Sequence, residues 1–210
     1  MSELVALQSA VQARLSPYRF AHTVGVVRMA ACLGELFCPS DVHMLRAAAL
    51  LHDITKELTP EAQLALLEEA GVSLRADELA SPKIYHGITA PLVIARDFPL
   101  FATDLLLSAV RWHTTGRAGM SLTEALLYLA DYIEEGRTFP DCVELRRRFF
   151  DARPHKMDRE ARLSHLALVL RESLEMTVAD LTDAGAPVCK DTLEALAWLK
   201  AEQNPFERIL

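Results

Sequence analysis

The stretch AALLHDITKEL, residues 48–58, sets His52 and Asp53 side by side at the end of an apolar run. Adjacent residues on a helix point about 100° apart, so both side chains can reach one metal ion that lies across the surface between them. The second oxygen of the aspartate would remain free to bridge to another ion. A His-Asp pair alone is weak evidence for such a site, so its meaning depends on the rest of the chain.

Four more residues of the same chemistry occur in apolar stretches elsewhere. They are His22, His86, His113 and Asp131. Four imidazoles and two carboxylates are more ligands than one zinc-like ion takes, and they suit two ions that keep positions open for water and an anionic substrate. His22 and Asp131 would complete the first ion beside the His-Asp pair. His86 and His113 would then hold a second ion or contact substrate oxygens.

Each residue also has a purely structural interpretation. His22 could be a hydrogen-bonded core histidine, His113 could complement the dipole at a helix C-terminus, and His86 could cap a helix. A purely structural role explains Asp131 least well, because this residue lies inside LLYLADYI (126–133), where burial of an unpaired carboxylate costs much free energy. Taken together, the six residues favour a metal site. The remaining histidines are expected outside it: His43, His155 and His165.

The apolar pattern is helical nearly throughout, and no strand pattern is present. Helix starts are expected at Ser2, Ser16-Pro17, Asp41, Thr59-Pro60, Thr89, Thr103, Ser121, Pro140, Asp158 and Asp191. Ser121 with Glu124, and Asp191 with Glu194, have the spacing of a capping box. The helix that starts at Asp41 is expected to run through the His-Asp pair to Lys56. We therefore predict an all-α chain that forms one domain over 1–210, with a metal-site core at about 16–140 and a C-terminal helical part at about 141–210.

Composition limits the classes of partner. The chain has 210 residues, is 51% hydrophobic and carries a formal net charge of -7, without the basic stripe of a general nucleic-acid binder. A polyanionic ligand would therefore need local positive charge at its site. The most apolar window, VGVVRMAACLGELF (24–37), contains Arg28 and Glu35, so no membrane span is expected, and the N-terminus does not resemble a signal peptide.

The cysteines indicate a reducing compartment. They form no CxxC pair and are Cys32, Cys38, Cys142 and Cys189. Reduced, buried thiols in a chain of this size suggest the cytoplasm. The apolar second and penultimate helices could support a homodimer.

Five segments carry a resemblance to a known family. They are RFAHTVGV (19–26), AALLHDITKEL (48–58), YHG (85–87), RWHTTGRAGMSLTEALLYLADYIEEGR (111–137) and KDTLEALAWL (190–199). Together they resemble the HD-domain metallophosphohydrolases, and more narrowly the YqeK-type branch of bacterial symmetrical diadenosine-tetraphosphate hydrolases. The resemblance implies an all-helical HD-domain bundle with additional C-terminal helices. It also implies a divalent metal site, usually described with iron, and hydrolysis of diadenosine tetraphosphate into two ADP by attack of a metal-bound hydroxide.

The resemblance also implies roles for individual residues. The metal ligands would be His22, His52, Asp53 and Asp131, with His86 and His113 at a second ion or against the phosphates. The catalytic residues would be Asp53, His86 and His113. The residues that bind the substrate would be Gly25, Lys56, His86, His113, Thr114 and Arg137. Of these, Lys56 and Arg137 would hold the phosphate chain. Three positions depart from the pattern of the family. Ala118 and Glu135 each stand where the family usually has Pro, and Cys189-Lys190 stands where it usually has His-Pro.

Several alternatives stay open at this point. The site could hold one or two ions, with Mn, Co or Zn in place of iron. The same fold could cleave another nucleotide or phosphoester, act as a di-iron oxygenase, or bind nucleotides without catalysis. Lys56 and Arg137 favour the phosphate functions over the oxygenase, because a polyanion needs local positive charge.

Overall fold

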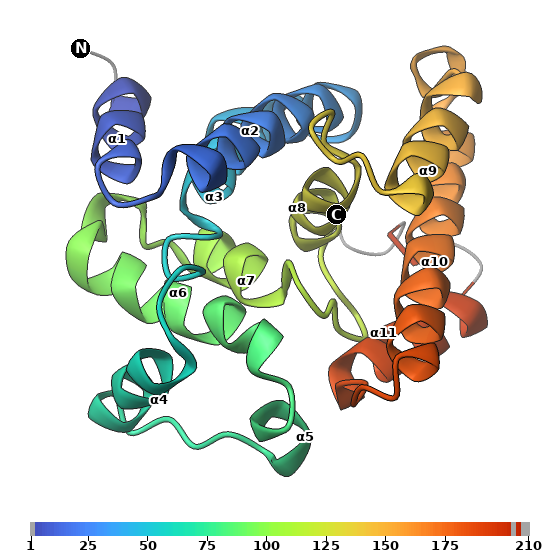
Figure 1. Cartoon of the computed structure of the whole chain (residues 1–210). Coiled ribbons are helices and arrows are strands. Elements are labelled where there is room, and N and C mark those ends of the chain that lie inside the picture. The colour runs from blue at the N-terminus through green and yellow to red at the C-terminus, as the bar shows by residue number, and fades with distance from the viewer. Residues whose placement is uncertain (1–2, 203–204, 207–210) are drawn as a thin grey trace.

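The computed structural model describes residues 3–202 together with 205 and 206, and over these residues it is helical without strands. The α-helices, shown in Figure 1, are α1 (Glu3–Gln12), α2 (Pro17–Phe37), α3 (Val42–Leu51), α4 (Pro60–Glu69), α5 (Ala76–Leu79), α6 (Tyr85–Asp97), α7 (Asp104–Trp112), α8 (Leu122–Ile133), α9 (Pro140–Asp151), α10 (Arg159–Asp183) and α11 (Lys190–Ala201). Short 3₁₀ turns occur at Pro39–Asp41, Pro82–Ile84, Pro99–Phe101 and Pro154–Lys156. The prediction of an all-α chain is confirmed.

Five of the α-helices begin where a polar side chain accepts one of the first free amides. The caps that do so are Ser16, Thr59, Thr103, Ser121 and Asp158. Ser121 and Glu124 form the expected capping box, with the serine amide donating to the glutamate at 2.8 Å. The expected cap at Ser2 lies outside the described residues.

Two sequence predictions about helix bounds were wrong, and one short helix was missed. The third helix ends at Leu51 and not at Lys56, because the next residues form tighter turns, such as the bond from the Ile54 amide to the Leu51 carbonyl at 3.1 Å. The helix expected from Thr89 already begins at Tyr85 and continues through Pro91, which removes one amide donor from it. The short helix α5 was not predicted.

The capping box expected at Asp191 and Glu194 is also absent. Cys189 occupies the N-cap of α11 without a side-chain bond. The Asp191 carboxylate instead accepts a hydrogen bond from Arg75 at 2.6 Å. A cation distant in the sequence therefore occupies the carboxylate that was expected to cap the helix.

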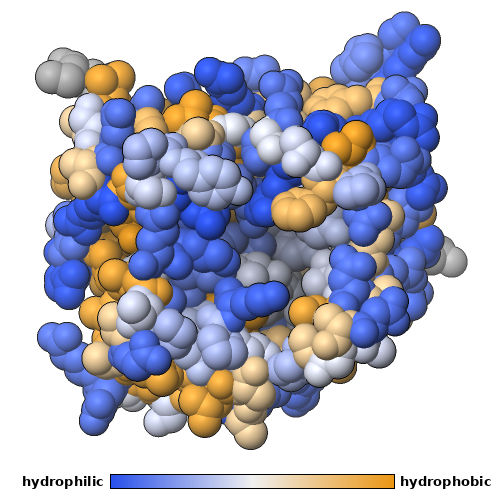
Figure 2. Space-filling model, in the orientation of Figure 1, coloured by the Kyte–Doolittle hydropathy of each residue, from blue (hydrophilic) through white to orange (hydrophobic). Residues whose placement is uncertain are grey.

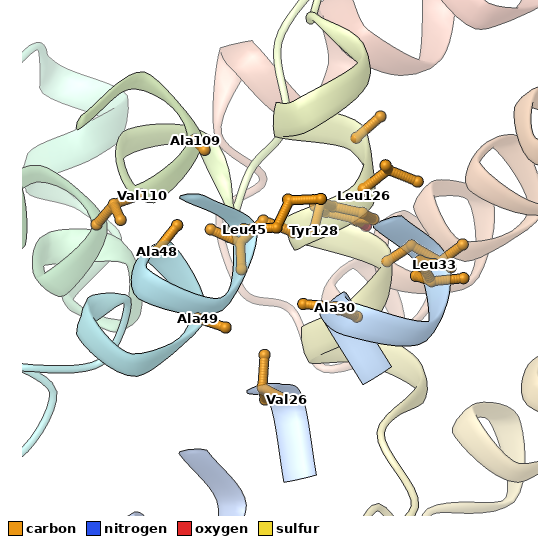
Figure 3. Close-up of a cluster of buried hydrophobic side chains, with 14 of the residues drawn as sticks. Val26, Ala30, Leu33, Leu45, Ala48, Ala49, Ala109, Val110, Leu126 and Tyr128 are labelled. Atoms are coloured by element: carbon orange, nitrogen blue, oxygen red, sulfur yellow. The ribbon is translucent and has the colours of Figure 1, made fainter. Parts of the chain in front are cut away.

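The core lies where α2, α3, α7 and α8 meet. Figure 3 shows Ala49 of α3 on the side of Val26 and Ala30 of α2, while Ala48 of α3 lies toward Ala109 of α7. Small residues at a helix contact let two backbones approach closely, which favours the packing of α3 between α2 and α7. On length and composition alone α2 could cross a membrane, but it packs against α3 and α8.

The last three helices form one side of the molecule (Figure 1). Both α9 and α10 contact α8, and α11 packs along α10. On the opposite side, α4 packs on α6, and α5 links them by way of the turn before α6. This arrangement leaves the ends of α3, α7 and α8 facing a common space.

Candidate metal centre and phosphate cleft

Asp53 lies between two pairs of imidazoles. Its Oδ2 is 3.5 Å from His52 Nε2 and 3.8 Å from His22 Nε2. Its Oδ1 is 3.4 Å from His86 Nε2 and 3.8 Å from His113 Nε2. The two oxygens of one carboxylate therefore face different histidine pairs, which is the arrangement a bridging ligand needs.

Asp131 joins this cluster from α8. Its Oδ1 lies 3.0 Å from His22 Nε2 and 3.8 Å from His52 Nε2. The six residues singled out in the sequence fall into overlapping groups whose donor atoms lie within 4.8 Å of one another. The structure thus brings together residues that span positions 22 to 131 of the chain.

Backbone carbonyls at two helix ends orient two of the imidazoles. His52 Nδ1 donates to the Ala49 carbonyl at 2.7 Å, and His113 Nδ1 donates to the Val110 carbonyl at 2.6 Å. Both carbonyls belong to the last turn of a helix, where no backbone amide is available to them. Because a carbonyl can only accept, the proton of each neutral ring lies on Nδ1, and the lone pair of Nε2 points to the centre.

A divalent cation fits this donor set. Among the described residues, the buried Nε2 atoms of His22 and His52 have no hydrogen-bond partner. Buried polar atoms in native proteins are nearly always satisfied, so an exception at converging imidazoles points to a ligand. Imidazole nitrogens with carboxylate oxygens suit iron, zinc, manganese or cobalt.

The electrostatics of the cluster keep both carboxylates ionised. Burial opposes ionisation, but His52 and His113 hold the pKa of Asp53 well below its usual value. Burial opposes it at Asp131 as well, where His22 and Arg137 hold the pKa well below its usual value. Two anionic ligands are therefore present at neutral pH.

Burial lowers the pKa of two further groups beside the carboxylates, His86 and Lys56. Burial lowers the pKa of His86 far below its usual value, and the neighbouring Lys56 lowers it further, so the ring is neutral at physiological pH. Burial also lowers the pKa of Lys56, although Asp53 and Asp131 raise it.

Two residues of the site were missed in the sequence. Arg19 donates to Asp53 Oδ2 at 2.8 Å, and Glu134 Oε1 lies 3.2 Å from His22 Nδ1. A carboxylate on the outer nitrogen of a ligating histidine fixes the ring and raises its basicity. Spacing could have found both, because Arg19 stands three residues before His22 and Glu134 three residues after Asp131, one helical turn away in each case.

Gly25 provides the space that the Glu134 carboxylate occupies. A Cβ at Gly25 would lie 2.2 Å from Glu134 Oε2, and that oxygen also accepts the Gly136 amide at 2.6 Å. Thr114 lies at the other histidine pair, with its hydroxyl 3.2 Å from the Nε2 atoms of both His86 and His113. The two residues thus lie on different sides of the centre.

A cleft of about 450 Å³ opens onto His113 and Asp131. Its charged lining comprises three cationic residues, Lys56, Lys83 and Arg137, and three acidic ones, Asp131, Asp141 and Asp180. Lys56 Nζ lies 3.2 Å from His86 Nε2, and Arg137 donates to Asp131 Oδ1 at 2.7 Å. Figure 2 shows this face of the molecule, which is hollowed near its centre. The three cations are the side chains with which this cleft could bind a polyanionic ligand in a chain of net charge -7.

The other histidines lie elsewhere. His43 and His155 are exposed. His165 is half-buried, with its Nε2 3.1 Å from the Phe149 carbonyl.

Comparisons with known proteins place the chain among enzymes. The sequence model of the HD domain matches residues 19–136. A symmetrical bis(5'-nucleosyl)-tetraphosphatase of Bacillus subtilis is 30% identical over 90% of this chain and 93% of its own length. Its counterpart in Halalkalibacterium halodurans is 29% identical over 92% of this chain and 95% of its own length.

A solved structure has the same overall fold. It is a predicted HD superfamily hydrolase involved in NAD metabolism from Clostridium acetobutylicum, with a TM-score of 0.81 and 27% identity. The match covers 96% of this chain and 98% of that one. On these grounds, and on the converged His-Asp cluster within the matched region, the chain belongs to the HD domain family.

Proposed function

We propose that this protein hydrolyses dinucleoside tetraphosphates symmetrically, with diadenosine tetraphosphate as substrate and two ADP as products. The observation that carries the proposal is Asp53, whose oxygens face two imidazole pairs, in a cluster whose His113 and Asp131 line a cleft with three cationic side chains. The names of the relatives from Bacillus subtilis and Halalkalibacterium halodurans support the symmetrical cleavage. The match of the HD domain to residues 19–136 supports the use of a divalent metal.

The ligand set follows from the donor atoms. The proposed ligands are His22, His52, Asp53 and Asp131 for one ion, with His86 and His113 for a second ion or for phosphate oxygens. Iron is the proposed metal, and Mn, Co and Zn are the alternatives to be tested. A bound divalent ion would lower the pKa of a water molecule and neutralise charge on the phosphoryl oxygens.

The protein's own residues would bind and orient the substrate. Lys56 and Arg137 would hold the phosphate chain, because both carry their charge at the cleft beside the acidic ligands. We propose that His86 and His113, which converge with Asp53, position an inner phosphate for attack, and that the Thr114 hydroxyl assists them by its contact with both rings. Gly25 would let the nucleotide or the Glu134 carboxylate come close to His22.

The cysteines and the net charge support a setting for the reaction. The four cysteines are all free, which supports a reducing compartment and hence the cytoplasm. The cationic cleft is local, and the net charge of -7 favours a small nucleotide over a nucleic acid as partner.

Product analysis tests the proposal. The metal-loaded protein should convert diadenosine tetraphosphate to ADP alone, and a mixture of ATP and AMP would exclude symmetrical cleavage. Hydrolysis assays with NAD, mononucleotides and a simple phosphoester test whether another nucleotide or phosphoester is the substrate. Assays with and without O₂ test the oxygenase alternative, because a hydrolase should work anaerobically. Tight ADP binding without turnover under any metal would support the sensor.

The site is tested by substitution of Asp53. Asp53→Ala should lose both bound metal and activity, because it removes a carboxylate that faces all four imidazoles. Asp151→Ala is the matched control, since Asp151 is exposed and pairs only with Arg147 at the surface. Full activity with metal retained in Asp53→Ala would show that the site lies elsewhere.

A further inference from the structure

A second cavity adjoins the phosphate cleft. Its volume is about 280 Å³, and its walls come from residues 80–84, from Thr114 and Thr115 after α7, and from the end of α10 with the start of α11. The residues that line both spaces are Lys83, Thr114, Thr177 and Leu181. A ligand whose phosphates lie in the cleft could therefore extend a second group into this cavity without crossing a wall.

The chemistry of the cavity differs from that of the cleft. Its walls are mainly apolar, with Ile84, Leu181, Ala186 and Pro187 among them, and its one cationic residue is Lys83, which it shares with the cleft. Small-molecule sites are typically concave and apolar with few polar groups. A flat aromatic group attached to a polyphosphate matches an apolar cavity joined to a cationic cleft.

Ionic contacts hold the walls of this cavity in place. Arg75, before α5, donates to Asp191 of α11 at 2.6 Å, and the Lys190 amide donates to Asp77 at 2.8 Å. These contacts clamp the segment that precedes residues 80–84 to the start of α11. Tyr85 adds a hydrogen bond to the Leu79 carbonyl at 2.8 Å. These contacts tie two walls of the cavity to each other, while the connection between α10 and α11 supplies Ala186 and Pro187.

We propose that this cavity is the subsite for one nucleobase of the substrate and that its apolar walls, at Leu181 and Ala186, contribute base-dependent affinity. The inference rests on the proposed function, because it takes the cleft to hold the phosphates. It assigns a role in substrate recognition to residues 184–189 and to the contacts of Arg75 with Asp191 and of Lys190 with Asp77. The same cavity would hold the base of one ADP product.

Filling the cavity tests the inference. Ala186→Phe places a ring in the cavity, and overpacking of this kind costs enough to raise the KM for diadenosine tetraphosphate and the Kd for ADP roughly tenfold or more. The Kd for inorganic pyrophosphate, which has no base, should not change. Ala184→Phe is the matched control, because Ala184 is exposed two residues earlier and is absent from the cavity wall; it should leave all three constants unchanged.

A second variant removes contact instead of adding bulk. Leu181→Ala shortens the opposite wall at a half-buried position, so the fold should be kept, and it should weaken ADP binding about tenfold with a smaller effect on pyrophosphate. Circular dichroism confirms the fold of each variant. The inference is overturned if neither variant changes ADP binding, or if both change ADP and pyrophosphate equally.

The two proposals fail in different ways. If the wild-type protein releases two ADP but Ala186→Phe leaves KM intact, only the base subsite is wrong. If the wild type does not cleave the dinucleotide, yet Ala186→Phe weakens ADP and spares pyrophosphate, the subsite stands and the proposed reaction is wrong.

Discussion

Replacing Gly25 by alanine should weaken metal binding through Glu134, whose carboxylate contacts the proposed ligand His22. The added Cβ would lie 2.2 Å from Glu134 Oε2 and 3.0 Å from Glu134 Cδ, and the three atoms nearest to it all belong to Glu134. Because Gly25 is inside α2, the backbone cannot shift readily, so the carboxylate must move. That movement would take Oε1 away from His22 Nδ1.

The magnitude follows from the lost support of His22. Loss of a carboxylate behind a ligating histidine typically costs about 10–100-fold in metal affinity, which is about 1.4–2.7 kcal/mol. Alanine itself favours a helix interior over glycine by about 1 kcal/mol. Metal-free Gly25→Ala should therefore be destabilised little, while its metal affinity falls.

A double-mutant cycle makes the reasoning sharp. Glu134→Ala removes the atoms that the new Cβ would meet. The double variant should therefore bind metal with the same affinity as Glu134→Ala. Its free energy of unfolding should be about 1 kcal/mol larger than that of Glu134→Ala, because alanine favours a helix interior over glycine. Metal affinity is measured by titration against a competing chelator, and stability by denaturant unfolding of the metal-free proteins.

Two outcomes would refute this account. One is an equal loss of metal affinity when Gly25→Ala is added to the wild type and to Glu134→Ala. The other is an unchanged metal affinity with a raised KM for the nucleotide in both backgrounds. The second result would support instead the close approach of nucleotide to Gly25 that the family resemblance implies.

Two further predictions concern charge. Lys56→Met should lower kcat/KM roughly 10²–10³-fold with metal retained, since it removes a cation from the cleft. Lys83→Met, at an exposed position of the same cleft, should lower kcat/KM less. Equal losses of kcat/KM in the two variants would contradict this prediction. Arg96 and then Arg14 lower the pKa of Asp97 from 3.8 to about 2, so the stability it contributes is present above about pH 4 and is lost as the pH falls toward 2. Asp97→Asn should thus lower Tm at pH 7 but not near pH 2, and a Tm difference that does not change with pH would disprove the link.

The sequence predicted those features that depend on local chemistry. Ser16, Thr59 and Asp158 cap helices because a side-chain oxygen can reach an amide one turn ahead, whatever surrounds it. The convergence of the His-Asp cluster was also predicted, since an unpaired Asp131 inside an apolar helix would be costly.

The features that were missed depend on distant partners. Asp191 has the spacing of a cap, but Arg75 lies 116 positions away and takes its carboxylate. Glu134 and Arg19 stand one helical turn from Asp131 and His22, but their contacts form only when α2 packs against α8 and α3. The end of α3 at Leu51 likewise reflects the turns around the site and not helix propensity.

The early ends of α3 and α7 have a consequence for engineering. If either helix ran on by one turn, the carbonyls of Ala49 and Val110 would be claimed by the amides of Asp53 and Thr114, four residues ahead. Efforts to raise thermal tolerance by lengthening helices, or to shorten the connections after them, should therefore leave these two junctions untouched. The end of α9 near Asp151 and the start of α10 near Arg159 offer a safer place for such redesign, since they lie outside the cluster of converging donors and outside the walls of the cleft and the cavity.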